Sequence, residues 1–210
     1  MAELTRWEMS TTPRGYGARF AELLLAGEDI EGEARLADAL LPRGARVLDA
    51  GCGMGRIAAA LQRRGHHVVA ADLDHELLAQ AAKTYPELTL VQERVETLSA
   101  PALAAAGHPS AYDLVVCVGN VMILGVPGSE RDMLAAMRDL LAPDGRILVG
   151  FHTFVALEHA REYDVEEFAL DCAAVGLAVE ARFGGYDLRR FDPAGDYAVH
   201  ILSRADDHER

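Results

Sequence analysis

The chain has 210 residues, half of them hydrophobic, and its 33 Asp and Glu against 20 Lys and Arg give a formal net charge of −13. This length suits one domain with a continuous core, and the composition excludes a disordered or fibrous chain. The acidic balance argues against a nucleic-acid partner, because phosphate binding needs clustered basic residues.

Three widely spaced cysteines, Cys52, Cys117 and Cys172, form no C-x-x-C pair. They suit neither a disulfide framework nor a zinc knuckle, so we expect a reducing compartment. The first 15 residues carry Glu3 and Glu8 and lack the apolar core of a secretory signal. No apolar run approaches a membrane span of about 20 residues. We therefore expect a cytoplasmic protein with no membrane partner.

Short apolar runs alternate with helical patterns along the chain. The first 45 residues have helical periodicity and are expected to fold over the sheet as a cap. Buried strands, nearly continuous in Val, Leu and Ile, are predicted at residues 46–50, 67–71, 88–92, 112–118 and 145–151. Helices are predicted between them at residues 55–64, 75–84 and 129–141. This alternation predicts a parallel sheet with helices on both faces.

Several residues mark the ends of these helices. Gly65 suits the position after a helix, and Ser129 with Asp132 has the spacing of a capping box. The sequence Pro143-Asp144-Gly145 is read as the stop after the helix at 129–141, and Asp164 with Glu167 as the cap of a helix that runs to residue 176.

The C-terminal third does not continue the alternation of strands and helices. Residues 177–183 and 197–203 alternate like strands, and a turn-rich segment joins them with no helix between. Two consecutive strands of this kind predict an antiparallel pair at the edge of the sheet.

A glycine-rich turn follows the first predicted strand. It reads Asp49-Ala50-Gly51-Cys52-Gly53-Met54-Gly55-Arg56. Glycine permits positive φ and lets a ligand approach the backbone, and in α/β sheets ligands bind at this carboxyl edge. Asp72 ends the next strand, about 20 residues after Gly51, where a carboxylate can accept both hydroxyls of a ribose.

These residues resemble the class I S-adenosylmethionine-dependent methyltransferases. The acidic-x-Gly-x-Gly-x-Gly loop of that family corresponds to Asp49, Gly51, Gly53 and Gly55. The resemblance covers roughly residues 16–204, because the fourth strand, the turn into the fifth and the two final strands also match. It implies a Rossmann-like, doubly wound, mostly parallel seven-stranded sheet with an antiparallel C-terminal strand.

The resemblance also implies S-adenosylmethionine as cofactor, S-adenosylhomocysteine as product, and a set of binding residues. The glycine loop is expected beside the methionine part, Asp72 at the ribose and Leu73 along the adenine. The expected cofactor-contacting residues are Asp49, Gly51, Cys52, Gly53, Gly55, Asp72, Leu73, Val95 and Asn120. Tyr16 and Arg19 are further candidates, which either close over the cofactor, with Arg19 pairing its carboxylate, or belong to an amphipathic capping helix. We expect one domain, 1–210, with a helical cap (1–45), a cofactor-binding half (46–151) and a substrate-side half with the edge strands (152–204).

One position departs from the family pattern. After the third strand the family presents an acid to the adenine amino group, and here that position holds Arg94. A guanidinium cannot accept a hydrogen bond from an amine. Either Glu93 or Glu96 substitutes, or only the Val95 backbone serves, or cofactor affinity is reduced.

Methyl transfer is an in-line displacement by a nucleophile of the substrate, so alignment and exclusion of water are the main requirements. A base is needed only where the nucleophile must lose a proton. His152, at the end of the fifth predicted strand, is a candidate base, with a backbone-bonded loop histidine as the alternative. Asn120 is a candidate methyl-side contact or a plain turn residue. Tyr186 and Arg189 are candidates for the substrate entrance.

Other site types are disfavoured. The segment at 118–122 lacks the Asn/Asp-Pro-Pro-aromatic tetrad of methylation on bases and amides, which argues against a DNA or glutamine methyltransferase. His66 and His67 are adjacent in the chain and cannot converge on one metal, so we expect no metal site.

The leading prediction is an enzyme that transfers a methyl group from S-adenosylmethionine to O, N or C of a small molecule. One alternative keeps the fold and binds S-adenosylmethionine or S-adenosylhomocysteine without catalysis. Another, a nicotinamide-dependent oxidoreductase, is disfavoured because the last glycine of G-x-G-x-x-G and a Tyr-x-x-x-Lys are missing.

Overall fold

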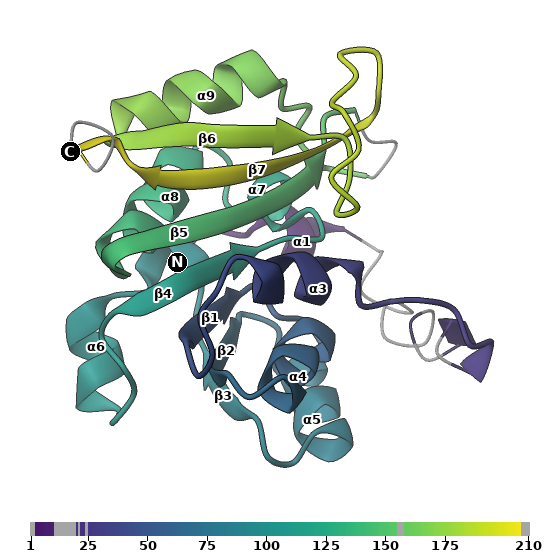
Figure 1. The fold of residues 1–210 in the computed structure, drawn as a ribbon, viewed down its shortest axis with the longest axis vertical. Helices are drawn as coiled ribbons and strands as arrows, with labels where there is room; N and C mark the ends of the chain where they lie inside the picture. Colours follow the sequence, from purple (N-terminus) through teal and green to yellow (C-terminus); the bar gives the residue numbers. More distant parts are fainter. Residues whose placement is uncertain (1–2, 11–19, 21, 24, 155–157, 207–210) are drawn as a thin grey trace.

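The computed structural model describes residues 3–10, 20, 22–23, 25–154 and 158–206. A seven-stranded sheet of order β3-β2-β1-β4-β5-β7-β6 forms its centre (Figure 1). The strands are β1 (Arg46–Ala50), β2 (His67–Asp72), β3 (Thr89–Gln92), β4 (Tyr112–Cys117), β5 (Leu141–His152), β6 (Leu177–Phe183) and β7 (Tyr197–Arg204).

The sheet is parallel from β3 to β5. Strand β7 runs antiparallel to both of its neighbours, β5 and β6. The predicted Rossmann-like sheet with a reversed C-terminal strand is therefore confirmed. The order reverses between β1 and β4, and at such a switch point the carboxyl ends of the strands leave a crevice for a ligand.

Helices cover both faces of the sheet, as predicted (Figure 1). One face carries α3 (Gly32–Ala39), α4 (Arg56–Arg63) and α5 (His75–Thr84), and the other carries α6 (Ala100–Ala105), α7 (Val121–Leu124), α8 (Glu130–Asp139) and α9 (Val165–Ala174). Each face of the sheet has its own hydrophobic core. Alternate residues of β1 point into the two cores, Val47 packing with α4 on one face and Leu48 with α8 on the other. None of the helices in the described ranges has the length and hydropathy of a membrane span.

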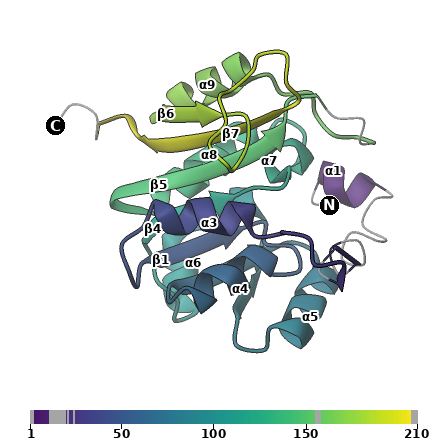
Figure 2. The ribbon, with the colours of Figure 1, turned by 45° about the vertical axis from the view of Figure 1, so that its right-hand side comes forward.

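The N-terminal segment departs from the predicted cap. Ala34, Leu36 and Ala37 of α3 are buried in the same core as α4, so α3 belongs to a helical layer on the sheet face. Among the described residues of this segment, the short α1 (Arg6–Met9) lies at the carboxyl edge of the sheet, next to α7 and near the start of α5 (Figure 2). The expectation for 1–45 was wrong for α3, because its apolar face buries against α4.

The predicted stop at residues 143–145 lies inside β5 and not before it. Tyr112 pairs with Leu141, but the next partners are Leu114 and Arg146, so β5 bulges between them. Residues 143–145 belong to this bulge. The local sequence alone does not distinguish a bulge inside a strand from a turn that precedes it.

Of the other predicted helix ends, two are confirmed and one is wrong. Gly65 has φ +92°, and the Asp164 carboxylate accepts the N–H of Glu167, as predicted for a helix end and a cap. The capping box at Ser129 is wrong, because its hydroxyl donates to the carbonyl of Val126 at 2.9 Å.

Candidate active site

The turn between β1 and α4 contains three glycines in the left-handed region. Their φ angles are +86° for Gly51, +55° for Gly53 and +77° for Gly55, a conformation that side chains with a Cβ rarely adopt. A Cβ on Gly51 would also lie 2.7 Å from Cγ1 of Val121. The Gly51 N–H donates to the carbonyl of Ala71 at 2.8 Å, which fixes the loop at the carboxyl ends of β1 and β2.

Asp72 lies at the end of β2 and holds this loop from the other side. Its Oδ2 accepts the N–H of Gly53 at 2.7 Å, and its Oδ1 accepts the N–H of Asp74 at 2.8 Å. Burial raises the pKa of Asp72, while these backbone bonds oppose the rise. A carboxylate has about four acceptor positions, so each oxygen retains one for a ligand.

A cleft of about 210 Å³ opens where these elements meet. The ends of β2, β3 and β4, the glycine loop and the N-terminal segment all contribute to its wall. Its lining comprises Thr5, Trp7, Ser10, Gly51, Gly53, Asp72, Leu73, Leu77, Glu93, Val95, Glu96, Val118, Gly119, Asn120, Val121, Leu124, Gly125 and Met133. Six of the predicted cofactor residues are among them: Gly51, Gly53, Asp72, Leu73, Val95 and Asn120.

Asp49 lies behind the cleft and not in its wall. Its side chain is buried, and its Oδ2 accepts the N–H of Ala58 in the first turn of α4 at 3.1 Å. Burial raises the pKa of Asp49 to about 7, with Arg56 opposing the shift. The two-residue alternation of β1 points Asp49 toward α4, so it couples the strand to the helix, and its predicted cofactor contact stays a prediction.

Cys52 and Gly55 also lie outside the wall of the cleft. Gly55 is the N-cap residue of α4, and a Cβ there would meet Leu88 at 2.8 Å. The Cys52 thiol lies 3.6 Å from the carbonyl of Gly53, and burial raises its pKa well above the usual value. The structure therefore gives both residues a part in shaping the loop, and their predicted cofactor contacts stay predictions.

Asn120 and His152 are joined at the ends of β4 and β5. The Asn120 side-chain oxygen accepts the backbone N–H of His152 at 2.9 Å, and Asn120 itself has φ +78°. The His152 Nδ1 lies 3.0 Å from the carbonyl oxygen of Asp196. Because a carbonyl only accepts, Nδ1 carries the proton, and in the neutral ring Nε2 has the free lone pair. His152 is not part of the cleft wall, and its ring packs edge-on against Tyr197.

Arg94 binds the N-terminal segment and does not line the cleft. Its Nη1 donates to the carbonyl of Glu3 at 2.7 Å, and its Nη2 donates to Oε2 of Glu8 at 2.8 Å. Arg94, which stands where the family pattern has an acid, therefore connects the end of β3 to the N-terminal segment.

The three substitutes considered for the missing adenine acceptor, Glu93, Val95 and Glu96, all line the cleft. Oε1 of Glu93 already accepts the N–H of Arg94 at 3.0 Å and the hydroxyl of Thr97 at 2.6 Å. Glu96 lies 3.9 Å from Arg94 and is free of those two bonds.

The sequence reading missed the contribution of α1 to the cleft. Thr5, Trp7 and Ser10 line it, and Thr5 with Glu8 forms a capping box around this four-residue helix. The Thr-x-x-Glu spacing was a usable signal. The predicted Tyr16 and Arg19 lie outside the described residues.

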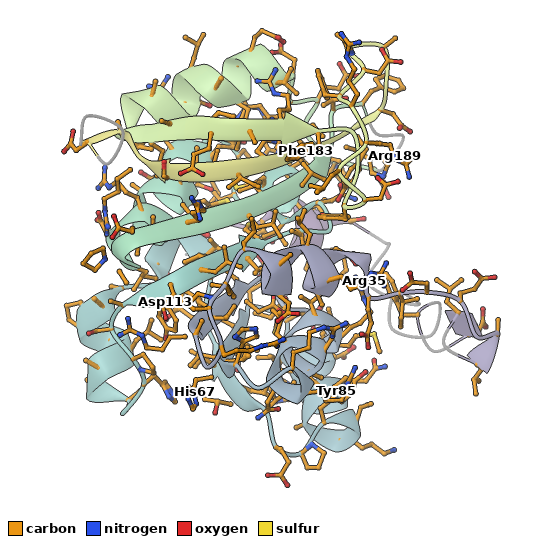
Figure 3. All side chains as sticks on the ribbon, viewed as in Figure 1. Arg35, His67, Tyr85, Asp113, Phe183 and Arg189 are labelled. Carbon is orange, nitrogen blue, oxygen red and sulfur yellow. The ribbon has the colours of Figure 1, made fainter. Side chains whose placement is uncertain are left out.

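The candidates for a substrate entrance are placed elsewhere. Tyr186 is largely buried, and its hydroxyl lies 2.7 Å from that of Tyr197. Arg189 is exposed in the segment after β6 and pairs with Asp187 at 2.8 Å (Figure 3). Neither residue lines the cleft. Within the described ranges, no three His, Cys, Asp or Glu side chains gather as metal ligands would.

Comparison with known proteins identifies the family. A family model described as a methyltransferase domain matches residues 47–145. A solved TehB-like S-adenosylmethionine-dependent methyltransferase from Corynebacterium glutamicum is 33% identical, with a TM-score of 0.79 over 91% of this chain and 97% of that chain. The chain belongs to the class I S-adenosylmethionine-dependent methyltransferases. Its cofactor is S-adenosylmethionine.

Two further methyltransferases are similar to the chain. The ubiquinone biosynthesis O-methyltransferase of Yersinia enterocolitica is 34% identical over 106 residues, which are 49% of this chain and 40% of that protein. The chain thus spans about two fifths of the length of the curated relatives it matches. The 1,6-didemethyltoxoflavin-N1-methyltransferase of Burkholderia thailandensis, solved with 1,6-didemethyltoxoflavin and S-adenosylhomocysteine, is 25% identical, with a TM-score of 0.61 over 93% of this chain and 92% of that one.

Proposed function

We propose that this protein transfers a methyl group from S-adenosylmethionine to a small-molecule acceptor. The observation that carries the proposal is Asp72, whose two oxygens each hold one backbone N–H and keep one acceptor position at the wall of the cleft. A ribose offers two adjacent hydroxyl donors, which match those positions. When bound, the cofactor supplies an electrophilic methyl group on a sulfonium.

The cleft offers a fitting set of residues for the rest of the cofactor. The backbone of Gly51 and Gly53 would hold the methionine part, and Leu73 and Val95 the adenine. Glu96 and Oε2 of Glu93 are the side-chain groups that could accept from the adenine amino group, because Oε1 of Glu93 already accepts two bonds.

At the acceptor end, this chain aligns the nucleophile and excludes water for an in-line displacement. Asn120 has its oxygen fixed by His152, so its amide nitrogen is the group left to donate into the cleft. His152 is the proposed base for acceptors that must lose a proton, because its Nε2 carries the lone pair in the neutral ring.

The acceptor is proposed to be an uncharged, largely apolar small molecule. Val121, Leu124 and Met133 contribute apolar side chains to the wall beyond Asn120. The net charge of −13 also disfavours an anionic acceptor. Two of the three similar proteins named above, one of ubiquinone biosynthesis and one of 1,6-didemethyltoxoflavin, are O- and N1-methyltransferases, so both atoms belong in a screen.

The domain organisation is proposed along the same lines. One methyltransferase domain, 1–210, has its cofactor-binding half at 46–151 and its substrate-side half with the edge strands at 152–204. The cleft wall supports the cofactor-binding half, because most of its residues come from 46–151 and the others from the N-terminal segment.

Calorimetric titration of the purified protein with S-adenosylhomocysteine tests the proposal. The expected result is micromolar binding at one site per chain, followed by release of S-adenosylhomocysteine with one member of a panel of phenols, amines and activated carbon acids. The absence of heat, together with no thermal shift at millimolar ligand, would contradict it. Turnover with any acceptor separates catalysis from binding alone.

A further inference from the structure

Residues 3–10, which we call the strap, lie across the carboxyl edge of the sheet. The N–H of Arg6 donates to the carbonyl of Gly125 at 3.0 Å, which joins the strap to the end of α7. Figure 2 shows α1 beside α7 and near α5. Three strap residues, Thr5, Trp7 and Ser10, form part of the cleft wall.

Trp7 is held at one end of the cleft. Its indole N–H donates to Oδ2 of Asp74 at 2.9 Å, and Asp74 is the N-cap residue of α5. Leu73 directly precedes Asp74, and Leu77 lies in the first turn of the same helix. An aromatic side chain and two aliphatic ones therefore share the end of the cleft that the proposed function assigns to adenine.

Two arginines connect the strap to the rest of the fold, Arg94 from outside the strap and Arg6 from within it. Arg94 binds Glu3 and Glu8, and Glu8 in turn accepts the backbone N–H of Thr5 at 2.8 Å. Arg6 pairs with the buried carboxylate of Glu130 at 3.0 Å.

The Arg94 contact joins residues that lie 86 positions apart in the sequence. Arg94 is 22% and Glu8 30% exposed, so their pairing is partly shielded from solvent. The position where the family presents an acid to adenine thus anchors the segment that carries Trp7.

We propose that Trp7 contacts the adenine ring of the cofactor, and that Arg94 is a positioning residue that holds Trp7 there. This inference rests on the proposed function. A base stacked on an aromatic side chain gains roughly 5- to 150-fold in affinity. The strap thus provides a stacking contact to adenine, at a site where Arg94 cannot provide the hydrogen-bond acceptor of the family pattern.

The chain contains one tryptophan, so its fluorescence reports on this contact directly. We would titrate the full chain with S-adenosylhomocysteine, adenosine and homocysteine while recording tryptophan emission. The two adenine-containing probes should quench or shift the emission, and homocysteine should not. Trp7→Ala should raise the Kd for S-adenosylhomocysteine 5- to 150-fold, and Trp7→Phe, which retains a ring, should raise it less.

Arg94→Met tests the positioning role. It should raise the Kd for S-adenosylhomocysteine about tenfold and reduce the emission change, while Arg94→Lys, which keeps the charge, should recover part of both. Arg46→Met is the matched control, because Arg46 pairs with Asp113 at 3.0 Å near the starts of β1 and β4, away from the strap (Figure 3). It should change neither readout.

The outcomes separate this inference from the function on which it rests. Calorimetric binding of S-adenosylhomocysteine with unchanged wild-type emission, and wild-type affinity in Trp7→Ala and Arg94→Met, would overturn the inference and leave the proposed function intact. No calorimetric binding to the wild-type chain would overturn both. The wild-type emission test needs no variant to fold.

Discussion

The side-chain oxygen of Asn120 and the backbone N–H of His152 form a hydrogen bond of 2.9 Å that joins the turn after β4 to the last residue of β5. Adjacent parallel strands need no contact beyond their ladder at this point. The bond therefore fixes one wall of the cleft by means of a residue that also lines it. The left-handed φ of Asn120 makes the position selective, because Asn tolerates that conformation better than most residues with a Cβ.

Replacement of Asn120 is expected to lower stability by two separable effects. Asn120→Ala loses the hydrogen bond and places alanine, which tolerates the left-handed region less well than asparagine, at φ +78°, so the free energy of unfolding should fall by about 1–3 kcal/mol. Asn120→Gly loses the bond but relieves the backbone, and should lose less. Chemical denaturation of both variants measures the two contributions, and equal stability of all three proteins would contradict the assignment.

Asp72→Ala is expected to weaken S-adenosylhomocysteine binding by about 1.5–3 kcal/mol, the range for hydrogen bonds to a charged group. The carboxylate also holds the backbone of Gly53 and Asp74, so thermal unfolding must be recorded alongside calorimetry. Asp49→Asn, in which the altered side chain lies behind the cleft, is the control and should bind with nearly wild-type affinity. An unchanged affinity in Asp72→Ala would remove Asp72 from the ribose role.

Asp49 predicts a pH dependence of stability. Burial raises its pKa from 3.8 to about 7, so the folded chain keeps a proton that the unfolded chain releases between these values. The resulting stability is fully present below pH 4 and is lost as the pH rises through 7. Asp49→Asn keeps an oxygen for the N–H of Ala58 and removes the buried charge.

The Asp49→Asn variant should therefore be more stable than the wild type at pH 8, by on the order of 2 kcal/mol. The difference should narrow as the pH falls toward 4. Urea denaturation of both proteins at pH 5 and pH 8 measures it. The same difference at both pH values would show that Asp49 does not titrate in this range.

His152→Ala is expected to lower turnover severalfold or more, without changing the affinity for S-adenosylhomocysteine. General base catalysis typically contributes about 10²–10⁴-fold where the acceptor must lose a proton. His159→Ala serves as a histidine control, because His159 is exposed and pairs with Glu158. Steady-state rates with an acceptor from the screen decide the matter, and a wild-type rate in His152→Ala would dismiss this residue as a base.

The sheet was largely predictable because its strands are buried and bounded by clear breakers. Strand β1, helix α5 and strand β6 begin and end at the predicted residues. The glycine loop and Asp72 were predictable for a related reason, since steric and hydrogen-bonding demands there restrict the residue type.

The remaining errors arise from contacts between distant parts of the chain. The start of β5 at Leu141 depends on its pairing with Tyr112, and the position of α1 on contacts such as that between Arg94 and Glu8. A four-residue helix has little propensity of its own, so its place is set by the surface that receives it. The role of Asp49, in contrast, follows from the alternation of β1 and was available from the sequence.

The reversed direction of β7 has a practical consequence for how the molecule is handled. Arg204, the last residue of β7, pairs with Leu177 at the start of β6 and donates to the carbonyl of Ala142 near the start of β5. The chain therefore leaves the sheet at the edge opposite the cleft, whereas Glu3 lies at its rim beside Arg94. A fluorophore, affinity handle or surface linkage placed after Arg204 would leave the mouth of the cleft open, while the same group attached ahead of Glu3 would crowd it.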